Sequence, residues 1–234
     1  MQNCIIIGHR GAAGHAPENT LLSFQTAFEF GADMVELDIH ETLDGHLVCI
    51  HDADVSRTTD GTGLVSEHTL NELRELDAGK GERIPLLSEV LSYAKNRLKV
   101  NIELKTLGVE KKIIDLLVER QMINDVVISS FYHGTLLVMK ELDKRVFTAA
   151  LISHSQDDLI NYICELGVDA LNPHYEIITN EIVSQAHNHG VLIYPWTVND
   201  IDRMFDLIRN LRVDGIITDF PDIGVKARSE VTDS

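Results

Sequence analysis

Three acidic residues in two apolar stretches could bind a metal ion. Glu36 and Asp38 are two residues apart in the run MVELDI, and Glu103 lies in the later run LKVNIELK. Residues two apart in a β-strand point to the same face, and buried carboxylates there must be neutralised. All-oxygen ligands favour one hard divalent cation, Mg²⁺ or Ca²⁺, with Mn²⁺ also compatible. The alternative is that one or two carboxylates point outward and pair with Arg10 or Lys105.

Two histidines follow apolar runs close to these acidic residues. His9 follows the run CIIIG, and His51 follows the short run LVCI. One imidazole can remove a proton while the other gives a proton to a leaving oxygen, because the ordinary histidine pKa suits both steps. Arg10 would hold phosphate oxygens through its planar guanidinium, and Lys105 would hold them as a point charge. Together with a bound cation, these groups predict cleavage of a phosphodiester.

Short apolar runs alternate with amphipathic helical stretches along the whole chain. Strands are expected at 4–8, 34–39, 98–105, 125–131, 145–151, 168–172, 190–198 and 214–219. Helices are expected at 21–30, 87–95, 109–120, 134–142, 156–166, 180–189, 200–209 and after residue 221. Such alternation implies a parallel sheet with right-handed crossovers. About eight units in roughly 250 residues predict an α/β fold, the (β/α)8 TIM barrel, with a doubly wound open sheet as the alternative.

The carboxyl ends of all barrel strands face one mouth, where ligands bind. The candidate residues above are therefore neighbours, however distant they are in sequence. Trp196 ends a strand and is expected either in the core or as an apolar wall beside a substrate. Glu18 belongs to the sequence PENT, which predicts first a helix start with Asn19 or Thr20 as N-cap; the alternative, less favoured, is that Glu18 reaches the site.

One segment interrupts the alternation. Residues 47–85 contain a further short strand, turn-rich sequence and a small helix before the next regular helix. This length exceeds an ordinary βα loop and predicts an insertion over the barrel mouth, between the second strand and the second helix of the barrel. The chain is expected to form a single domain over residues 1–234, with a frayed polar tail at 227–234.

Charge and cysteine content exclude several classes of protein. The formal net charge is −17, which disfavours nucleic acid and anionic membrane surfaces as partners. The 3 cysteines are scattered without a CxxC spacing, so neither a disulfide framework nor a structural zinc site is indicated. The start MQNCIII has neither the basic residues nor the apolar length of a signal peptide. We therefore expect a cytoplasmic protein with a small-molecule substrate and no stable membrane association; a homo-oligomer is compatible with the sequence.

The same residues resemble a known family. The motifs GHRG with APENT, GADMVELDIHETLDGHLVCIHD, RTTDGTG, IPLLSEVL, NIELK, WTVND and DGIITDFP follow in order between about residues 5 and 222. This set is similar to the glycerophosphodiester phosphodiesterase family. The middle stretch, from about 109 to 188, resembles the family only in its alternation of strands and helices.

The resemblance implies a barrel and a metal-dependent phosphoric diester hydrolase of glycerol and lipid metabolism. Its substrates would be glycerophosphodiesters such as glycerophosphocholine and glycerophosphoethanolamine, and its products sn-glycerol 3-phosphate and an alcohol. Carried over by position, the catalytic pair is His9 and His51, and the metal ligands are Glu36, Asp38 and Glu103. Arg10 and Lys105 match phosphate contacts, and Trp196 matches an aromatic residue near the glycerol.

Several alternatives stay open at this point. The glycerol 2-hydroxyl could attack phosphorus to form a cyclic phosphate, with His9 as base and His51 as acid, or water could attack directly. A related barrel could cleave intact lipids or lysophospholipids, although the chain has no basic or apolar membrane-binding stretch. A non-catalytic barrel could bind glycerophosphodiesters as a sensor, but so many catalytic residue types together favour an enzyme.

Overall fold

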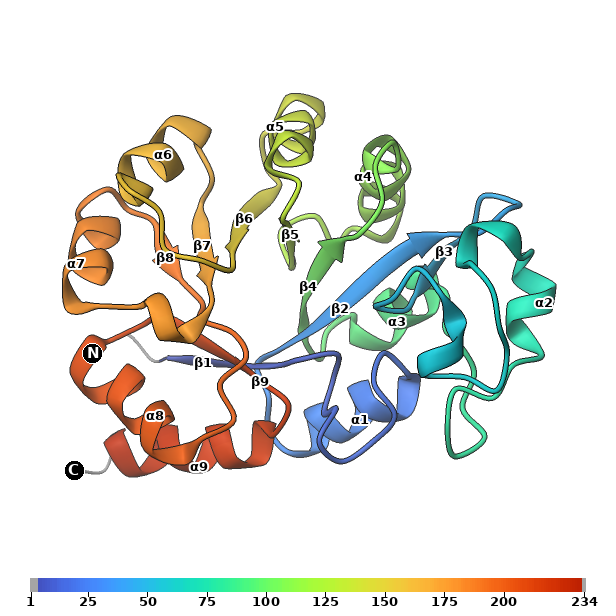
Figure 1. Ribbon diagram of the computed structural model, residues 1–234, viewed down its shortest axis with the longest axis horizontal. Coiled ribbons are helices and arrows are strands. Elements are labelled where there is room, and N and C mark those ends of the chain that lie inside the picture. Colours follow the sequence, from blue (N-terminus) through green and yellow to red (C-terminus); the bar gives the residue numbers. More distant parts are fainter. Residues whose placement is uncertain (1–3, 233–234) are drawn as a thin grey trace.

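Eight parallel strands form a nearly closed barrel in the computed structural model, which describes residues 4–232 (Figure 1). They lie in the order β8-β7-β6-β5-β4-β2-β1-β9. Their bounds are β1 Ile5–Gly8, β2 Met34–Glu41, β4 Lys99–Leu104, β5 Val126–Ser130, β6 Phe147–Ile152, β7 Ala170–Pro173, β8 Leu192–Ile193 and β9 Gly215–Thr218. A backbone hydrogen bond of 3.1 Å from Asp214 to Ile193 connects the β9 end of the sheet to β8. The predicted (β/α)8 barrel is confirmed.

Helices cover the outside of the barrel, as Figure 1 shows. Their bounds are α1 Leu21–Glu29, α3 Leu87–Ala94, α4 Glu110–Arg120, α5 His133–Leu142, α6 Leu159–Leu166, α7 Asn180–Asn188, α8 Ile201–Phe205 and α9 Pro221–Thr232. Short 3₁₀ turns occur at Val55–Arg57, Val65–Glu67 and Tyr175–Ile177, and a π-helical turn at Asp206–Leu211 follows α8. Between residues 4 and 232, none of these helices has both the length and the apolar character needed to cross a membrane.

The last helix corrects one expectation. α9 continues to Thr232, Ala227 is fully buried against the barrel, and Arg228 forms an ion pair with Asp33. The expectation of a frayed tail is therefore wrong for residues 227–232, because packing and this ion pair hold the helix in place. Residues 233 and 234 lie outside the described part of the chain.

The barrel interior is built in layers. A lower apolar layer takes side chains from the strands or the residues beside them: Ile7, Met34, Val127, Ala149, Ala170, Tyr194 and Ile217. Because inward positions recur every second residue, the next layer toward the carboxyl ends lies two residues further along each strand. That layer includes His9, Glu36, Trp196 and Asp219. The apolar layer is thus the floor on which the polar residues of the mouth lie.

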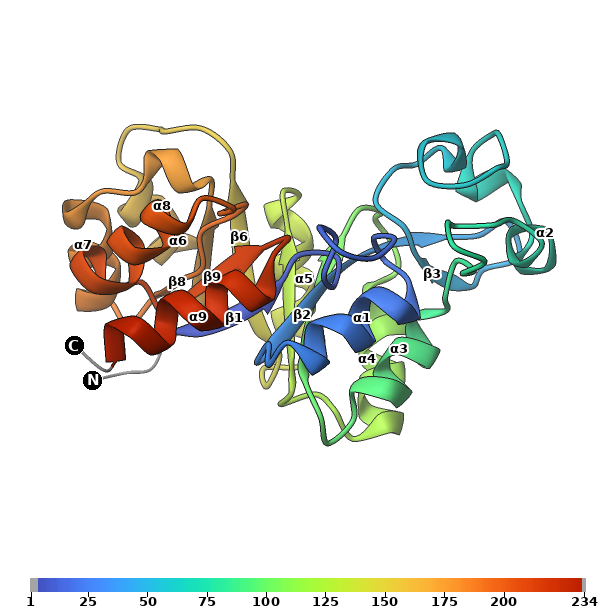
Figure 2. The ribbon, with the colours of Figure 1, turned by 90° about the horizontal axis from the view of Figure 1, so that it is seen from below.

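The insertion between β2 and α3 has an apolar cluster of its own. It begins with β3 (Leu47–Cys49), which pairs antiparallel with β2, and it contains α2 (Leu70–Arg74). Val48, Val55 and Leu73 are fully buried within its cluster. Figure 2 shows the insertion extending from the end of β2 to one side of the barrel. The predicted insertion is therefore a packed unit attached beside the mouth.

Candidate active site

The three predicted carboxylates meet at the carboxyl ends of β2 and β4. Glu36 and Asp38 point inward from β2, and Glu103 is in register with Asp38 on the neighbouring β4. One carboxylate oxygen of each lies within 4.8 Å of the other two, and all three side chains are buried. The outward direction of the alternative is wrong, because all three side chains are buried at inward positions, but the pairing with Lys105 and Arg10 that it included does occur.

Nearby cations offset only part of this negative charge. Lys105 Nζ forms an ion pair with Glu103 and lies 3.1 Å from Asp38 Oδ1. Glu36 Oε2 accepts a 2.8 Å hydrogen bond from the backbone N–H of Arg10. The other Glu36 oxygen, Oε1, is buried and has no hydrogen-bond partner in the described part of the chain. An unpartnered carboxylate oxygen beside two more carboxylates fits the oxygen ligand set of Mg²⁺ or Ca²⁺.

Two of the three carboxylates, Glu36 and Glu103, resist ionisation when no cation neutralises the cluster. Burial, followed by the charges of Asp38 and Glu103, raises the pKa of Glu36 well above its ordinary value. Burial and the charge of Asp38 also raise the pKa of Glu103 to about 7. Burial opposes ionisation of Asp38 too, but Lys105 and Arg10 outweigh it and lower the Asp38 pKa. A bound cation would therefore displace protons from this cluster.

His9 is held by a carboxylate from the opposite end of the chain. His9 Nδ1 lies 2.7 Å from Asp219 Oδ1, and Asn199 Nδ2 donates a 2.6 Å hydrogen bond to Asp219 Oδ2. Burial opposes ionisation of Asp219, but the hydrogen bonds with His9 and Asn199 outweigh it and lower the Asp219 pKa. An ionised Asp219 can only accept, so Nδ1 carries its hydrogen and Nε2 is left as the basic nitrogen.

His51 has a matching arrangement at the start of the insertion. His51 Nδ1 lies 2.6 Å from Asp52 Oδ1. Arg57 Nε donates a 2.5 Å hydrogen bond to Asp52 Oδ2, and this contact lowers the pKa of Asp52 to about 2. Asp52 is thus a permanent acceptor for Nδ1–H, and His51 Nε2 is the nitrogen available for proton transfer. Burial lowers the pKa of His51 below its ordinary value.

Arg10 adopts a left-handed backbone conformation at the end of β1. Its φ of 50° is unfavourable for an arginine by about 1 kcal/mol. The conformation points the Arg10 N–H at Glu36, and the guanidinium donates a 2.7 Å hydrogen bond to Glu18 Oε1. Gly11 continues the turn with φ 88°, where a Cβ atom would lie 2.4 Å from Ser23 Oγ. The GHRG motif therefore shapes the turn that carries Arg10 to the carboxylates.

Aromatic side chains form the other wall of the mouth. The Trp196 indole N–H donates a 2.8 Å hydrogen bond to the Asn172 carbonyl, which fixes the plane of the ring. Phe131 contacts this ring edge-to-face with centroids 5.6 Å apart, and His174 does so at 5.4 Å. Phe131 is 42% exposed, so part of this wall is open to a ligand.

The predicted residues share one cavity. Seven of the eight predicted site residues line a cavity of about 60 Å³: His9, Arg10, Glu36, His51, Glu103, Lys105 and Trp196. The eighth, Asp38, is only 1% exposed and does not line it. Asn101, Ser129 and Phe131 also line the cavity. Acid–base groups, cationic side chains and a carboxylate cluster thus surround a space that a small molecule can enter.

Comparison with known proteins decides the family. Residues 9–223 match the sequence model of the Glycerophosphoryl diester phosphodiesterase family. A glycerophosphodiester phosphodiesterase of Caldanaerobacter subterraneus subsp. tengcongensis is 39% identical, covering 93% of this chain and 95% of that protein. Another from Bacillus altitudinis is 37% identical, covering 97% and 98%. The chain belongs to the glycerophosphoryl diester phosphodiesterase family. It is a hydrolase of phosphoric diesters.

Solved structures agree with this assignment. An Oleispira antarctica phosphodiesterase in complex with the product sn-glycerol-3-phosphate is 30% identical, with a TM-score of 0.88 over 99% of this chain and 98% of that one. A putative glycerophosphoryl diester phosphodiesterase from Silicibacter pomeroyi has a TM-score of 0.92 at 24% identity, over 99% of this chain and 95% of that one. The second likeness shows the barrel fold.

Sequence reasoning gives no role to three acidic residues at the mouth of this phosphodiesterase. Asp52 follows His51 directly, and Asp219 follows β9; both positions signal a histidine partner at the mouth. For Glu18 the less favoured alternative holds, because Glu18 accepts hydrogen bonds from Arg10 and Arg57 beside the mouth. Of the two residues that follow Glu18, one caps the helix and the other contacts the site. Thr20 is the N-cap of α1, and Asn19 donates a 2.9 Å hydrogen bond to Asp38 of the carboxylate cluster.

Proposed function

We propose that this phosphodiesterase hydrolyses glycerophosphodiesters, such as glycerophosphocholine and glycerophosphoethanolamine, to sn-glycerol 3-phosphate and an alcohol, with one divalent cation. The observation that carries the proposal is the cavity shared by His9, His51 and the buried carboxylate cluster. The relatives named glycerophosphodiester phosphodiesterase and the Oleispira structure with sn-glycerol-3-phosphate support this choice of substrate and product.

Glu36, Asp38 and Glu103 are the proposed metal ligands. Their close oxygens, and the unpartnered Glu36 Oε1, favour Mg²⁺ or Ca²⁺, with Mn²⁺ also compatible. A bound cation would supply charge stabilisation at the phosphate and lower the pKa of a coordinated hydroxyl. The Asn19 amide and Lys105 hold the Asp38 carboxylate in place for this role.

The two histidines are the proposed acid and base. In the first step His9 Nε2 removes the proton of the glycerol 2-hydroxyl, whose oxygen attacks phosphorus and forms a cyclic phosphate. His51 Nε2 donates a proton to the leaving alcohol oxygen. Water then opens the cyclic phosphate with the two roles exchanged, so the enzyme returns to its starting protonation state. The carboxylates Asp219 and Asp52 keep each Nε2 directed away from its partner and available.

Arg10, Lys105 and Trp196 are the proposed binding residues. The Arg10 guanidinium and Lys105 Nζ line the cavity beside the carboxylates, where they would contact the phosphate oxygens. The Trp196 ring and Phe131 would contact the apolar carbons of the glycerol.

Release of glycerol 3-phosphate tests the proposed function. Chelator-stripped protein should be inactive on glycerophosphoethanolamine, and addition of Mg²⁺, Ca²⁺ or Mn²⁺ should restore product release in a coupled assay. Release without any metal would contradict the cation's role. No release with any metal, across several head groups, would contradict the substrate class.

A cyclic intermediate separates the two routes of attack. We expect a time course followed by ³¹P NMR to show cyclic glycerophosphate that forms early and then decays. Its absence in a well-resolved time course, or rejection of synthetic cyclic phosphate as a substrate, would favour direct attack by water.

Metal binding should also stabilise the fold. A ligand at a hundred times its Kd stabilises by about 2.7 kcal/mol, which raises the Tm of a domain this size by about 5–10 °C. We expect Mg²⁺ or Ca²⁺ to produce this shift in differential scanning fluorimetry. Glu36→Gln should remove it without lowering the Tm of the metal-free protein, because burial and the charges of Asp38 and Glu103 already oppose ionisation of Glu36 there, and the amide is neutral.

Glu110→Gln is a matched control for the stability experiment. Glu110 is a buried glutamate of α4 that accepts a 2.5 Å hydrogen bond from Thr135 and does not line the cavity. This variant should have a lower Tm but keep the full metal-induced shift. A shift that survives Glu36→Gln would place the cation elsewhere.

A further inference from the structure

The Arg57 guanidinium of the insertion bridges two carboxylates beside the mouth. Its Nη1 and Nη2 donate hydrogen bonds of 2.9 and 2.7 Å to the two oxygens of Glu18. Its Nε donates a 2.5 Å hydrogen bond to Asp52 Oδ2. A planar guanidinium can make these three bonds at once, because its donors form a rigid fork.

This bridge ends at a reacting group. Asp52 uses Oδ2 for Arg57 and Oδ1 for His51 Nδ1, at 2.6 Å. Rotation of the Asp52 carboxylate would therefore break the His51 contact. The hydrogen bond from Arg57 opposes that rotation. Asp52 is itself one-third exposed, so water would compete for its oxygens if the guanidinium were absent.

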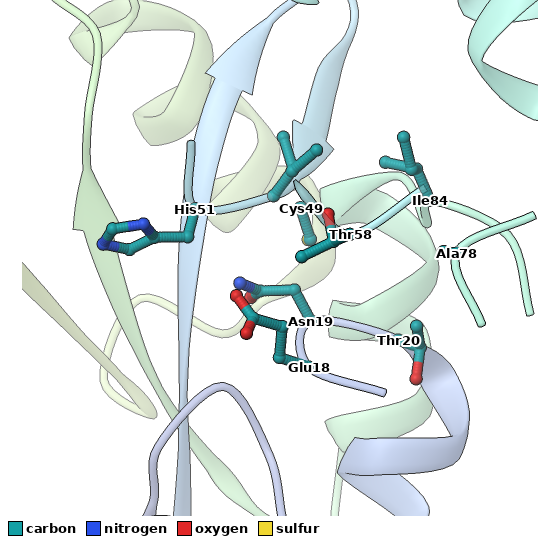
Figure 3. Close-up of a pocket in the computed structure, with 9 residues that line it drawn as sticks. Glu18, Asn19, Thr20, Cys49, His51, Thr58, Ala78 and Ile84 are labelled. Atoms are coloured by element: carbon teal, nitrogen blue, oxygen red, sulfur yellow. The ribbon is translucent and has the colours of Figure 1, made fainter. Parts of the chain in front are cut away.

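The segments that carry Arg57 and Glu18 are both held in place by packing. Arg57 ends the 3₁₀ turn Val55–Arg57, whose first residue is buried in the apolar cluster of the insertion and whose N-cap Asp54 accepts from Ser56. Glu18 comes from the loop before α1. Figure 3 shows Glu18 reaching from that loop toward β2, in the same pocket as His51 and Thr58, the residue that follows Arg57. The pocket has a volume of only about 10 Å³, so these segments lie close together.

We propose that Arg57 is a positioning residue for the proton transfer by His51: anchored on Glu18, it fixes Asp52 and so directs His51 Nε2 at the leaving oxygen. The inference rests on the proposed function, in which His51 protonates the departing alcohol. The proposed acid His51, its partner Asp52 and the positioning residue Arg57 then all belong to the insertion, and only the anchor Glu18 comes from outside it.

Two substrates with different leaving groups isolate this role. Glycerophosphoethanolamine releases ethanolamine, whose alkoxide oxygen needs a proton in order to leave. The p-nitrophenyl ester of glycerol 3-phosphate releases nitrophenolate, which leaves without a proton. The readout is kcat/KM for glycerophosphoethanolamine divided by kcat/KM for the p-nitrophenyl ester. A loss of folded enzyme or of phosphate binding lowers both values equally and cancels in the ratio.

Arg57→Gln should lower this ratio by about tenfold or more, since proton transfer contributes on the order of 10²–10⁴. Asp52→Asn should lower it by a similar factor, and the double variant should resemble Asp52→Asn alone, because both residues act through His51. Arg57→Lys should restore little, because one ammonium cannot reproduce the fork on Glu18 while it holds Asp52.

Arg74→Gln is the matched control. Arg74 also belongs to the insertion, and it pairs with Glu89 at 2.5 Å. This variant should keep the wild-type ratio. His51→Ala gives the decrease in the ratio that results when the acid is lost completely.

The outcomes separate the two proposals. If wild-type enzyme hydrolyses neither ester, the proposed function fails and this inference fails with it. If His51→Ala keeps the wild-type ratio, His51 is not the acid and the inference is wrong. If His51→Ala lowers the ratio but Arg57→Gln leaves it unchanged, the inference alone is overturned.

Discussion

Release of glycerol 3-phosphate should fall by about a thousandfold or more when Glu36 or Glu103 is changed to Gln. A catalytic cation contributes several kcal/mol to transition-state stabilisation, and each 1.36 kcal/mol corresponds to about a factor of ten. Each change removes one oxygen ligand from a cluster whose oxygens lie within 4.8 Å of one another. The measurement is kcat/KM on glycerophosphoethanolamine, with the metal concentration raised until the rate no longer increases.

The metal titration separates weak binding from lost chemistry. If the variants recover wild-type turnover at high metal, the carboxylates contribute affinity only. Glu110→Gln, which changes a buried glutamate outside the cavity, should retain near wild-type kcat/KM. Full activity of Glu36→Gln or Glu103→Gln at low metal would contradict the assignment of the metal site.

The clustering of the three carboxylates could be predicted because it follows from strand spacing and strand order. The spacing of Glu36 and Asp38 places both on one face of β2, and the barrel order places β4 beside it. Burial then requires a compensating charge, whatever the detailed side-chain positions. The Glu36 Oε1 atom without a partner, by contrast, depends on the left-handed turn at Arg10, which the sequence signals only through the glycines around it.

The partner of His9 could not be derived from sequence pattern alone. His9 and Asp219 are 210 residues apart, and they meet because β9 pairs with β1 when the barrel closes. The fold prediction brings both to the mouth, but it does not say which carboxylate accepts from which histidine. That choice depends on side-chain conformation, here on Asn199 holding the second oxygen of Asp219.

The contacts of Arg57 could not be predicted from the sequence either. The insertion lacks the regular alternation that predicts the barrel strands, so the direction of its side chains cannot be predicted from spacing. Its position depends on a separate apolar cluster around Val55 and Leu73. Only the packed structure places Arg57 between Glu18 and Asp52.

Replacing His9 with Ala should lower kcat by about 10²–10⁴-fold, the usual contribution of a positioned acid or base. The Asp219 carboxylate fixes Nδ1–H and leaves Nε2 to accept the proton of the attacking hydroxyl. Asp219→Asn should also lower kcat, because an amide can donate to Nδ1 and favour the tautomer that carries its proton on Nε2. KM should change little in both variants, because Arg10 and Lys105 still bind the phosphate.

A second histidine–aspartate pair provides the control for His9. His187 Nε2 lies 2.9 Å from Asp214 Oδ2, and Asp214 precedes β9 at the end of the barrel remote from the mouth. His187→Ala removes an imidazole and a carboxylate contact of similar length, so it should affect stability but leave kcat per folded molecule unchanged. If His187→Ala lowered kcat as much as His9→Ala, the loss at His9 would reflect structural damage and not catalysis. If His9→Ala instead retained kcat and formed cyclic phosphate at the wild-type rate, the base would have to be another group in the cavity.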